Sequence, residues 1–181
     1  MKPRQLLQLA LIGAFLCLPI AAVRADDVLP AKVSNLVHVP LAKVGSGNYR
    51  KLGFKVYTAT LWAPEGVWSA EKPFALEVVY ARKLSRDTVF DAVMEDIRDQ
   101  GVADEATLKR WEGVLTAAIP AVEENDTIIA VSRPGKQALL FHNGTQIASI
   151  DEKPLSNAFF NIWLGDKADE SLKRKLLGKD D

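Results

Sequence analysis

Five polar side chains fall on the otherwise apolar faces of two predicted strands, residues 50–62 and 73–82. They are Arg50, Thr58, Thr60, Tyr80 and Arg82. Side chains alternate across a strand, so the even-numbered residues of each segment share one face. A buried polar group must find a partner or lose free energy, so this pattern has two interpretations. Either the threonines only reflect strand preference and an arginine reaches water, or the faces line a cleft in which these five residues bind a ligand.

An arginine in such a cleft favours one chemical class of ligand. Its planar guanidinium holds both oxygens of a carboxylate, so Arg50 or Arg82 predicts an amphipathic acid, such as a fatty acid, more than a neutral molecule. Apolar neighbours on the same faces would form the wall of the cleft. They are Leu52, Phe54, Val56, Leu76 and Val78.

Most standard catalytic and metal-binding motifs are missing from the sequence. It has no glycine-rich phosphate loop and no Gly-x-Ser-x-Gly turn for a nucleophile. The two histidines, His38 and His142, fall on or at the end of predicted strands, where a solvated histidine is the ordinary case. The acidic residues 123–126 are expected to form a solvated loop. The sequence therefore predicts no metal and no cofactor, and its 23 basic and 23 acidic residues cancel, which does not favour a nucleic-acid partner.

The first 25 residues are typical of a secretory signal peptide. A basic start at Lys2 and Arg4 precedes a short apolar run, and the small residue Ala25 follows that run. A membrane anchor is the alternative, but an anchor needs about 20 apolar residues and Pro19 shortens this run. Cleavage after Ala25 would remove the lone Cys17 and leave no membrane span. Because secreted eukaryotic domains often use disulfides, an exported chain without cysteine indicates a bacterial periplasm.

Hydrophobic periodicity divides the remaining residues, 26–181, into the strands and helices of a single domain. Alternating segments predict strands at 36–44, 50–62, 73–82, 126–132, 137–142 and 145–150. The glycine-rich residues 45–48 are expected to form a turn, and Asn143-Gly144 a tight hairpin. Two amphipathic helices follow the third strand, with Ser85 or Asp87 and then Asp104 as their caps, and two shorter helices end the chain. One antiparallel sheet with helices on one face, an α+β fold, accommodates this order.

Four groups of residues, in a consistent order, resemble one protein family. The first is Gly45-x-Gly47-x-x-Arg50 with Gly53-Phe54-Lys55-Val56-Tyr57-x-Ala59-x-Leu61-Trp62, and the second is Phe74-x-Leu76-x-x-x-Tyr80-x-Arg82. The third is Trp111 with Ile119-Pro120-x-Val122-x-x-x-Asp126, and the fourth is Phe159-Phe160-x-Ile162-Trp163-Leu164-Gly165 with Leu172-x-x-x-Leu176-Leu177-Gly178. Together they are similar to chalcone isomerase-like proteins, most of all to an exported bacterial branch. The resemblance implies that family's open-faced β-sandwich, an antiparallel sheet with a layer of helices over one face.

The resemblance also has implications for activity. The plant enzymes of this family close a flavanone ring without metal or cofactor, using an arginine, a threonine and a tyrosine. Arg50 is similar to that arginine and Thr58 to that threonine, but Ser85 stands where the tyrosine is expected, so chalcone cyclisation is not expected. Some relatives without enzymatic activity bind fatty acids. Other relatives, in mitochondria, bind haem. Haem needs an axial ligand to its iron, and the sequence gives no argument for either histidine in that role.

Three functions are compatible with these residues. The first is a periplasmic protein that binds an apolar or amphipathic small molecule in a cleft between sheet and helices. The second is a cofactor-independent lyase or isomerase for an unsaturated carbonyl compound, with Arg50 and Thr58 stabilising an oxyanion. The third is a structural or partner-binding module whose core is filled. A cleft of roughly 300 Å³ or more would favour the first two, and the sequence does not indicate an oligomeric state.

Overall fold

Six antiparallel strands form one sheet in the order β1-β2-β3-β4-β5-β6. The computed structural model describes Leu29 and residues 31–179, so the predicted signal peptide, with Cys17 and the cleavage site, lies outside the described residues. The strands are β1 (Leu41–Lys51), β2 (Phe54–Pro64), β3 (Phe74–Tyr80), β4 (Thr127–Ser132), β5 (Ala138–His142) and β6 (Thr145–Ile150). The helices are α1 (Ala31–Ser34), α2 (Arg86–Asp99), α3 (Glu105–Ala118), α4 (Lys153–Leu164) and α5 (Glu170–Leu176).

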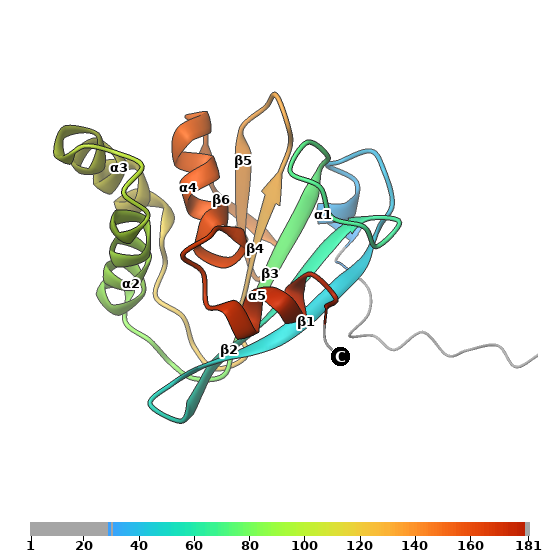
Figure 1. Cartoon of the computed structure of the whole chain (residues 1–181), viewed down its shortest axis with the longest axis horizontal. Coiled ribbons are helices and arrows are strands. Elements are labelled where there is room, and N and C mark those ends of the chain that lie inside the picture. The colour runs from blue at the N-terminus through green and yellow to red at the C-terminus, as the bar shows by residue number, and fades with distance from the viewer. Residues whose placement is uncertain (1–28, 30, 180–181) are drawn as a thin grey trace, which may run out of the picture.

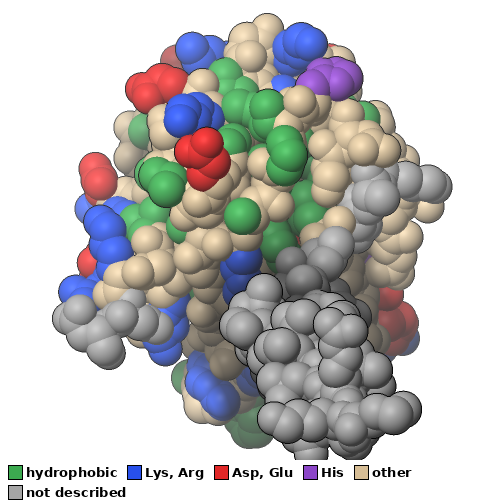
Figure 2. Space-filling view, turned by 90° about the vertical axis from the view of Figure 1, so that its right-hand side faces the viewer, with side chains coloured by type: hydrophobic (Ala, Val, Ile, Leu, Met, Phe, Trp, Pro, Cys, Tyr) green, Lys and Arg blue, Asp and Glu red, His purple; other side chains and the backbone are tan. Residues whose placement is uncertain are grey.

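The helices form unequal layers on the two faces of the sheet (Figure 1). α2 to α5 cover one face, and the short α1 packs on the other. The main core lies beneath the four larger helices and includes Leu61, Leu76, Trp111 and Leu115. A smaller core on the opposite face joins Val33 and Val37 to Trp62, Ile129 and Phe141. Figure 2 looks at the side away from α2 and α3, where hydrophobic side chains gather among charged ones.

The predicted starts of α2 and α3 are confirmed by side-chain caps, and a third cap begins α5. Ser85, rather than Asp87, accepts a hydrogen bond from the Thr88 amide at the start of α2. Asp104 accepts from the Thr107 amide at the start of α3, and Asp169 begins α5 in the same way. Such caps satisfy amide groups that have no partner inside the helix.

The predicted boundaries of the first strand are wrong at both ends. Residues 36–40 are not part of a strand, and β1 begins after Pro40, which has no amide hydrogen for the ladder. His38 therefore lies in a turn, with a positive φ of 56°, instead of on an edge strand. The predicted turn at residues 45–48 is instead the middle of β1, paired with Leu61 to Thr58 of β2.

The predicted strand 50–62 is also divided by a hairpin turn. Leu52 and Gly53 have φ values of 52° and 83°, so the chain reverses there and Arg50 belongs to β1. Two consecutive positive φ values are typical of the tight turns that twist correctly between antiparallel strands. The first position of such a turn is commonly Asn or Asp. Because Leu52 occupies it here, the sequence does not predict the turn.

An extra residue in β2 then changes which side chains face the helices. Tyr49 pairs with Tyr57 but Arg50 pairs with Lys55, so Val56 is a bulge. Beyond the bulge, Tyr57, Ala59 and Leu61 face the main core. The predicted even-numbered face is therefore wrong for the rest of β2, whose even-numbered residues face the opposite side.

Two glycines of β1 allow α5 to pack directly on the strand. A Cβ atom at Gly45 would overlap the carbonyl oxygen of Lys175, and one at Gly47 would lie 2.8 Å from Leu172 Cδ1. The glycine-rich segment is thus needed for the close approach of a helix and not for chain reversal. This packing fixes the position of the C-terminal segment over the β1 end of the sheet (Figure 1).

Replacing Gly45 with alanine is expected to destabilise the fold by about 3 kcal/mol, since backbone atoms of α5 must move to admit the methyl group. Gly113 is a matched control, because it lies inside α3 with open space around the Cβ position. Gly113→Ala should stabilise the protein by about 0.5–1 kcal/mol through helix propensity. Urea unfolding of both variants tests the account, which fails if the two substitutions have similar effects.

Candidate functional site

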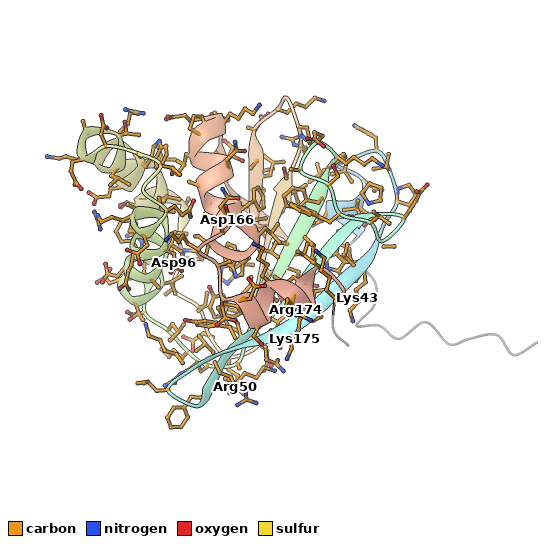
Figure 3. All side chains as sticks on the ribbon, in the orientation of Figure 1. Lys43, Arg50, Asp96, Asp166, Arg174 and Lys175 are labelled. Atoms are coloured by element: carbon orange, nitrogen blue, oxygen red, sulfur yellow. The ribbon has the colours of Figure 1, made fainter. Side chains whose placement is uncertain are left out.

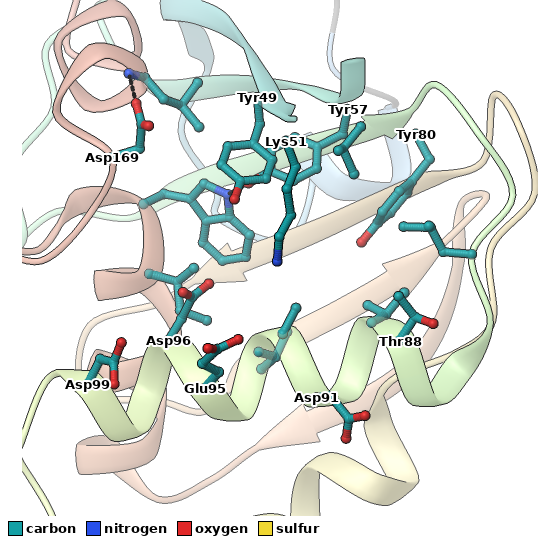
Figure 4. A pocket seen from close by; sticks show the side chains of 18 of the residues that line it. Tyr49, Lys51, Tyr57, Tyr80, Thr88, Asp91, Glu95, Asp96, Asp99 and Asp169 are labelled. Atoms are coloured by element: carbon teal, nitrogen blue, oxygen red, sulfur yellow. Dashed lines mark hydrogen bonds between the residues drawn. The ribbon is translucent and has the colours of Figure 1, made fainter. Parts of the chain in front are cut away.

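A cleft of about 880 Å³ lies between one end of the sheet and α2 (Figure 4). One wall is formed by β1, β2 and β3, and the facing wall by α2. Residues 161–172, which contain the connection from α4 to α5, contribute a third side. The volume falls within the range of about 300–1,000 Å³ that small-molecule sites occupy.

Three tyrosines at paired positions of adjacent strands form the aromatic wall of the cleft. Tyr49 pairs with Tyr57, and Tyr57 pairs with Tyr80. The rings of Tyr49 and Tyr57 are stacked with centroids 4.9 Å apart, and Tyr80 meets Tyr57 edge to face at 6.0 Å. The indole nitrogen of Trp163, from α4, donates a hydrogen bond of 3.0 Å to the Tyr57 hydroxyl. The pairing register of the strands and one hydrogen bond from α4 therefore fix the positions of these aromatic rings.

The Tyr80 hydroxyl is a polar group that the aromatic wall offers to a ligand. It extends from the sheet toward α2 in Figure 4, where no hydrogen bond joins it to another described residue. Burial raises the pKa of Tyr80 to about 12. The hydroxyl therefore stays protonated at ordinary pH and is available as a neutral donor.

Gln100, at the end of α2, provides a second polar group on the cleft wall. Its amide nitrogen donates a hydrogen bond of 2.8 Å to the Ala158 carbonyl of α4. Its side-chain oxygen is buried and has no partner among the described residues. A buried acceptor without a partner costs free energy unless water or a ligand supplies the donor.

Charged side chains surround the mouth of the cleft. The α2 wall carries Asp91, Glu95, Asp96 and Asp99, and Lys51 extends toward it from β1 (Figure 4). Desolvation, together with the neighbouring Glu95 and Asp99 carboxylates, raises the pKa of Asp96, while Lys51 opposes that rise. An aromatic interior with a charged rim suits a molecule that is apolar at one end and polar at the other.

Sequence and structure comparisons place this architecture among known proteins. A sequence model described as chalcone isomerase-like matches residues 20–178. The chain belongs to the chalcone isomerase-like family. A fatty-acid binding protein of Arabidopsis thaliana has a similar fold, with a TM-score of 0.60 and 15% identity over 76% of this chain and 87% of that one. Comparison with curated protein sequences gives no significant match.

The family fold, predicted as an open-faced β-sandwich of α+β class, is confirmed by these findings. Of the five candidate ligand-binding residues, the structure brings Tyr80 and Arg82 together at the cleft. Three of the predicted wall residues, Leu52, Phe54 and Val56, also line it.

Arg50, Thr58 and Thr60 do not line the cleft, so the prediction that they share its floor is wrong. The Thr58 hydroxyl donates to Asn48 Oδ1 at 2.9 Å, and the Thr60 hydroxyl lies 3.0 Å from Ser46 Oγ. Both pairs lie on the sheet face opposite α2, because β2 presents its odd-numbered residues to the helices. Arg50 Nη1 donates to the Gly53 carbonyl at 3.3 Å within the hairpin.

These positions also bear on the chemistry of the plant enzymes. Arg50 and Thr58, which resemble their arginine and threonine, are outside the cleft, and Ser85 is occupied in capping α2. The Arg50–Thr58 oxyanion pair considered for an isomerase is therefore not assembled in this cleft.

Sequence reasoning missed Tyr49, Tyr57, Trp163 and the α2 carboxylates as parts of the site. The predicted even-numbered face does not include Tyr57, because that prediction did not recognise the turn at Leu52-Gly53 and the Val56 bulge. The acidic residues of α2 are exposed and form the rim of the cleft. The signal that could have identified this wall is the occurrence of Tyr49, Tyr57 and Tyr80 on three consecutive strands, where they pair with one another.

His142 belongs to a hydrogen-bond network around Asp126, whereas a solvated histidine was expected at this strand end. Its Nε2 lies 2.9 Å from Asp126 Oδ2, which also accepts from the Glu123 amide at 2.8 Å. Asp126 Oδ1 accepts from the Asn143 side chain at 2.7 Å. These bonds, with the Asn143 bond first, lower the pKa of Asp126 to about 2. Within the described part of the chain, no three His, Cys, Asp or Glu side chains are arranged to hold a metal, and no helix is long and apolar enough to span a membrane.

Asp126→Asn is expected to destabilise the protein by about 1–3 kcal/mol at neutral pH, because charge-assisted hydrogen bonds are lost. The folded pKa of about 2 lies below the ordinary value, so this stabilisation is complete above about pH 4 and is lost as the pH falls toward 2. The gap in unfolding free energy between wild type and variant should therefore close in that interval. Denaturant titrations at several pH values measure it, with exposed Asp151→Asn as control. A gap that stays constant with pH would contradict the role of the carboxylate.

Proposed function

We propose that the protein binds an amphipathic acid, of fatty-acid type, in the cleft between the sheet and α2. The observation that carries the proposal is an aromatic cavity of about 880 Å³ whose wall carries Arg82 and the Tyr80 hydroxyl. The similar fold of a fatty-acid binding protein supports binding of this kind of ligand. The volume also argues against a module whose core is filled.

The distribution of charge suggests the orientation of the ligand. The acyl chain would pack against Tyr49, Tyr57 and Trp163, which bring large apolar surfaces together. Four carboxylates on α2 repel an anionic head from the helix wall, so the head would lie toward Arg82 at the end of β3. Tyr80, protonated because of its raised pKa, would donate a second hydrogen bond to that head.

A catalytic function receives less support from the site. The isomerase alternative depended on Arg50 and Thr58 acting together on a substrate, and both side chains lie outside the cleft. Binding requires only the surfaces and polar groups that the cleft does contain.

We also propose that the protein acts in a bacterial periplasm, after export and cleavage behind Ala25. The basis is the sequence of the first 25 residues and the absence of cysteine after them. The intact mass of protein recovered from the periplasm should correspond to a chain that begins at Asp26. Recovery of the uncleaved chain in the membrane fraction would contradict both parts of this proposal.

Arg82→Ala is expected to weaken the affinity for a long-chain fatty acid by about ten- to a hundredfold, because one charge-assisted hydrogen bond is lost. Arg50→Ala is the matched control, since Arg50 is also an exposed strand-end arginine but does not line the cleft. Its affinity should equal that of the wild type. Titration calorimetry measures both. No binding by the wild type, or equal affinities of the two variants, would contradict the proposal.

A further inference from the structure

The tip of the β1–β2 hairpin exposes two large apolar side chains at the mouth of the cleft. Leu52 is 92% exposed and Phe54 is 67% exposed, more than any other large hydrophobic residue among those described. The tight turn at Leu52-Gly53 places both at the point of the hairpin, which forms the lower end of the molecule in Figure 1. Exposed apolar side chains on a projecting tip are typical of a surface that is covered by another phase or molecule.

Basic side chains surround this apolar tip. Arg50, Lys51 and Lys55 flank Leu52 and Phe54 in the sequence, and all three are exposed. Figure 3 shows Arg50 at this end of the sheet. Residues 41–64 contain no Asp or Glu, although basic and acidic residues cancel over the whole chain. Among the described residues, neither Arg50 nor Lys55 has an ion-pair partner. Positive charge is therefore concentrated at this tip. Lys51 interacts with the Asp96 carboxylate across the cleft, whereas the charges of Arg50 and Lys55 are not neutralised by an ion pair with another described residue.

We propose that this hairpin tip docks on the surface of an anionic phospholipid bilayer. Leu52 and Phe54 would enter the boundary between head groups and acyl chains, and Arg50 and Lys55 would lie among the lipid phosphates. Long basic side chains suit this position because their stems are apolar and their charges stay at the polar level. The anionic lipid is specified by the excess of basic residues, which a neutral surface would not attract.

A protein partner fits this surface less well. A stable protein interface buries about 800 Å² on each partner, usually over a broad, complementary patch. Here the apolar surface consists of two side chains at the point of a two-residue turn. Insertion into a fluid phase needs no complementary shape, whereas a protein interface does.

The α2 carboxylates determine how the protein would approach the bilayer. Asp91, Glu95, Asp96 and Asp99 lie on the wall across the cleft from the hairpin, and an anionic surface would repel them (Figure 4). Docking would therefore tilt the hairpin toward the lipid and keep α2 away from it. In that orientation the cleft mouth lies between the bilayer and the aqueous phase.

The docking site is continuous with the cleft. Leu52 and Phe54 also line the cavity, so an acyl chain could pass between bilayer and cleft along apolar side chains. This consequence for ligand exchange rests on the proposed function. The docking itself does not, because it depends only on the tip.

Two double variants separate the apolar and the electrostatic contributions. L52N/F54T removes the apolar tip while it keeps local structure, since Asn-Gly favours this turn and threonine favours strands. R50Q/K55Q removes two charges and leaves the apolar tip in place. The matched controls are V67T, an exposed valine in the β2–β3 connection at the opposite end of the sheet, and K136Q/K153Q, an exposed lysine pair away from the hairpin. All proteins carry the same N-terminus, so any contribution of residues 1–25 is common to them.

Co-sedimentation with vesicles of phosphatidylglycerol and phosphatidylcholine, and of phosphatidylcholine alone, measures docking. The wild type should bind the anionic vesicles at least about tenfold more tightly, because each basic residue near such a surface contributes about fivefold. L52N/F54T and R50Q/K55Q should each lose about tenfold or more on anionic vesicles, and both controls should stay within about twofold of the wild type. Added salt should weaken the binding of the wild type.

The proposal is overturned if the wild type does not bind anionic vesicles or binds both kinds of vesicle equally. It is overturned as well if the affinity of L52N/F54T for anionic vesicles equals that of the wild type. It is also overturned if the wild type forms a dimer without vesicles that L52N/F54T disperses, since the tip would then join two copies of the chain. Calorimetry of the wild type with dissolved fatty acid separates this test from that of the proposed function. Vesicle binding without fatty-acid binding would retain the docking and reject the ligand, and the reverse result would reject the docking alone.

Discussion

The cleft depends on the contact between α5 and β1, in which a helix lies directly on a strand because Gly45 and Gly47 have no side chains. This contact holds the C-terminal segment over the β1 end of the sheet. Trp163 then reaches Tyr57 with a hydrogen bond and closes one side of the aromatic wall. α2 packs against α4 rather than against the hairpin of β1 and β2, so the space between hairpin and helix stays open.

The class of fold and the order of its elements follow from local physics and could be predicted. The caps Ser85, Asp104 and Asp169 and the apolar helix stripes each act within a few residues of sequence. The β1–β2 hairpin could not be predicted in the same way. Its turn begins with Leu52, whose apolar side chain conceals the signal, and the Val56 bulge changes the face that follows.

The turn and the bulge together determined which candidate site residues were misplaced. Tyr80 and Arg82 lie on β3 and just beyond it, where regular alternation holds and the prediction places them at the cleft. Arg50 lies before the turn and donates a hydrogen bond within the hairpin. Thr58 and Thr60 lie beyond the bulge, which directs both to the other face of the sheet. A period-two pattern identifies the faces of a strand only while the strand is uninterrupted.

The central claim is that the cleft between the sheet and α2 holds an amphipathic acid. A crystal structure of the protein with a fatty acid brominated at its terminal carbon tests it most directly, because anomalous scattering locates the bromine without bias. The account predicts the bromine beside Tyr57 and Trp163 and the carboxylate within hydrogen-bond distance of Arg82. A bromine on the opposite sheet face near Thr58 and Thr60, or an empty cleft at saturating ligand, would contradict it.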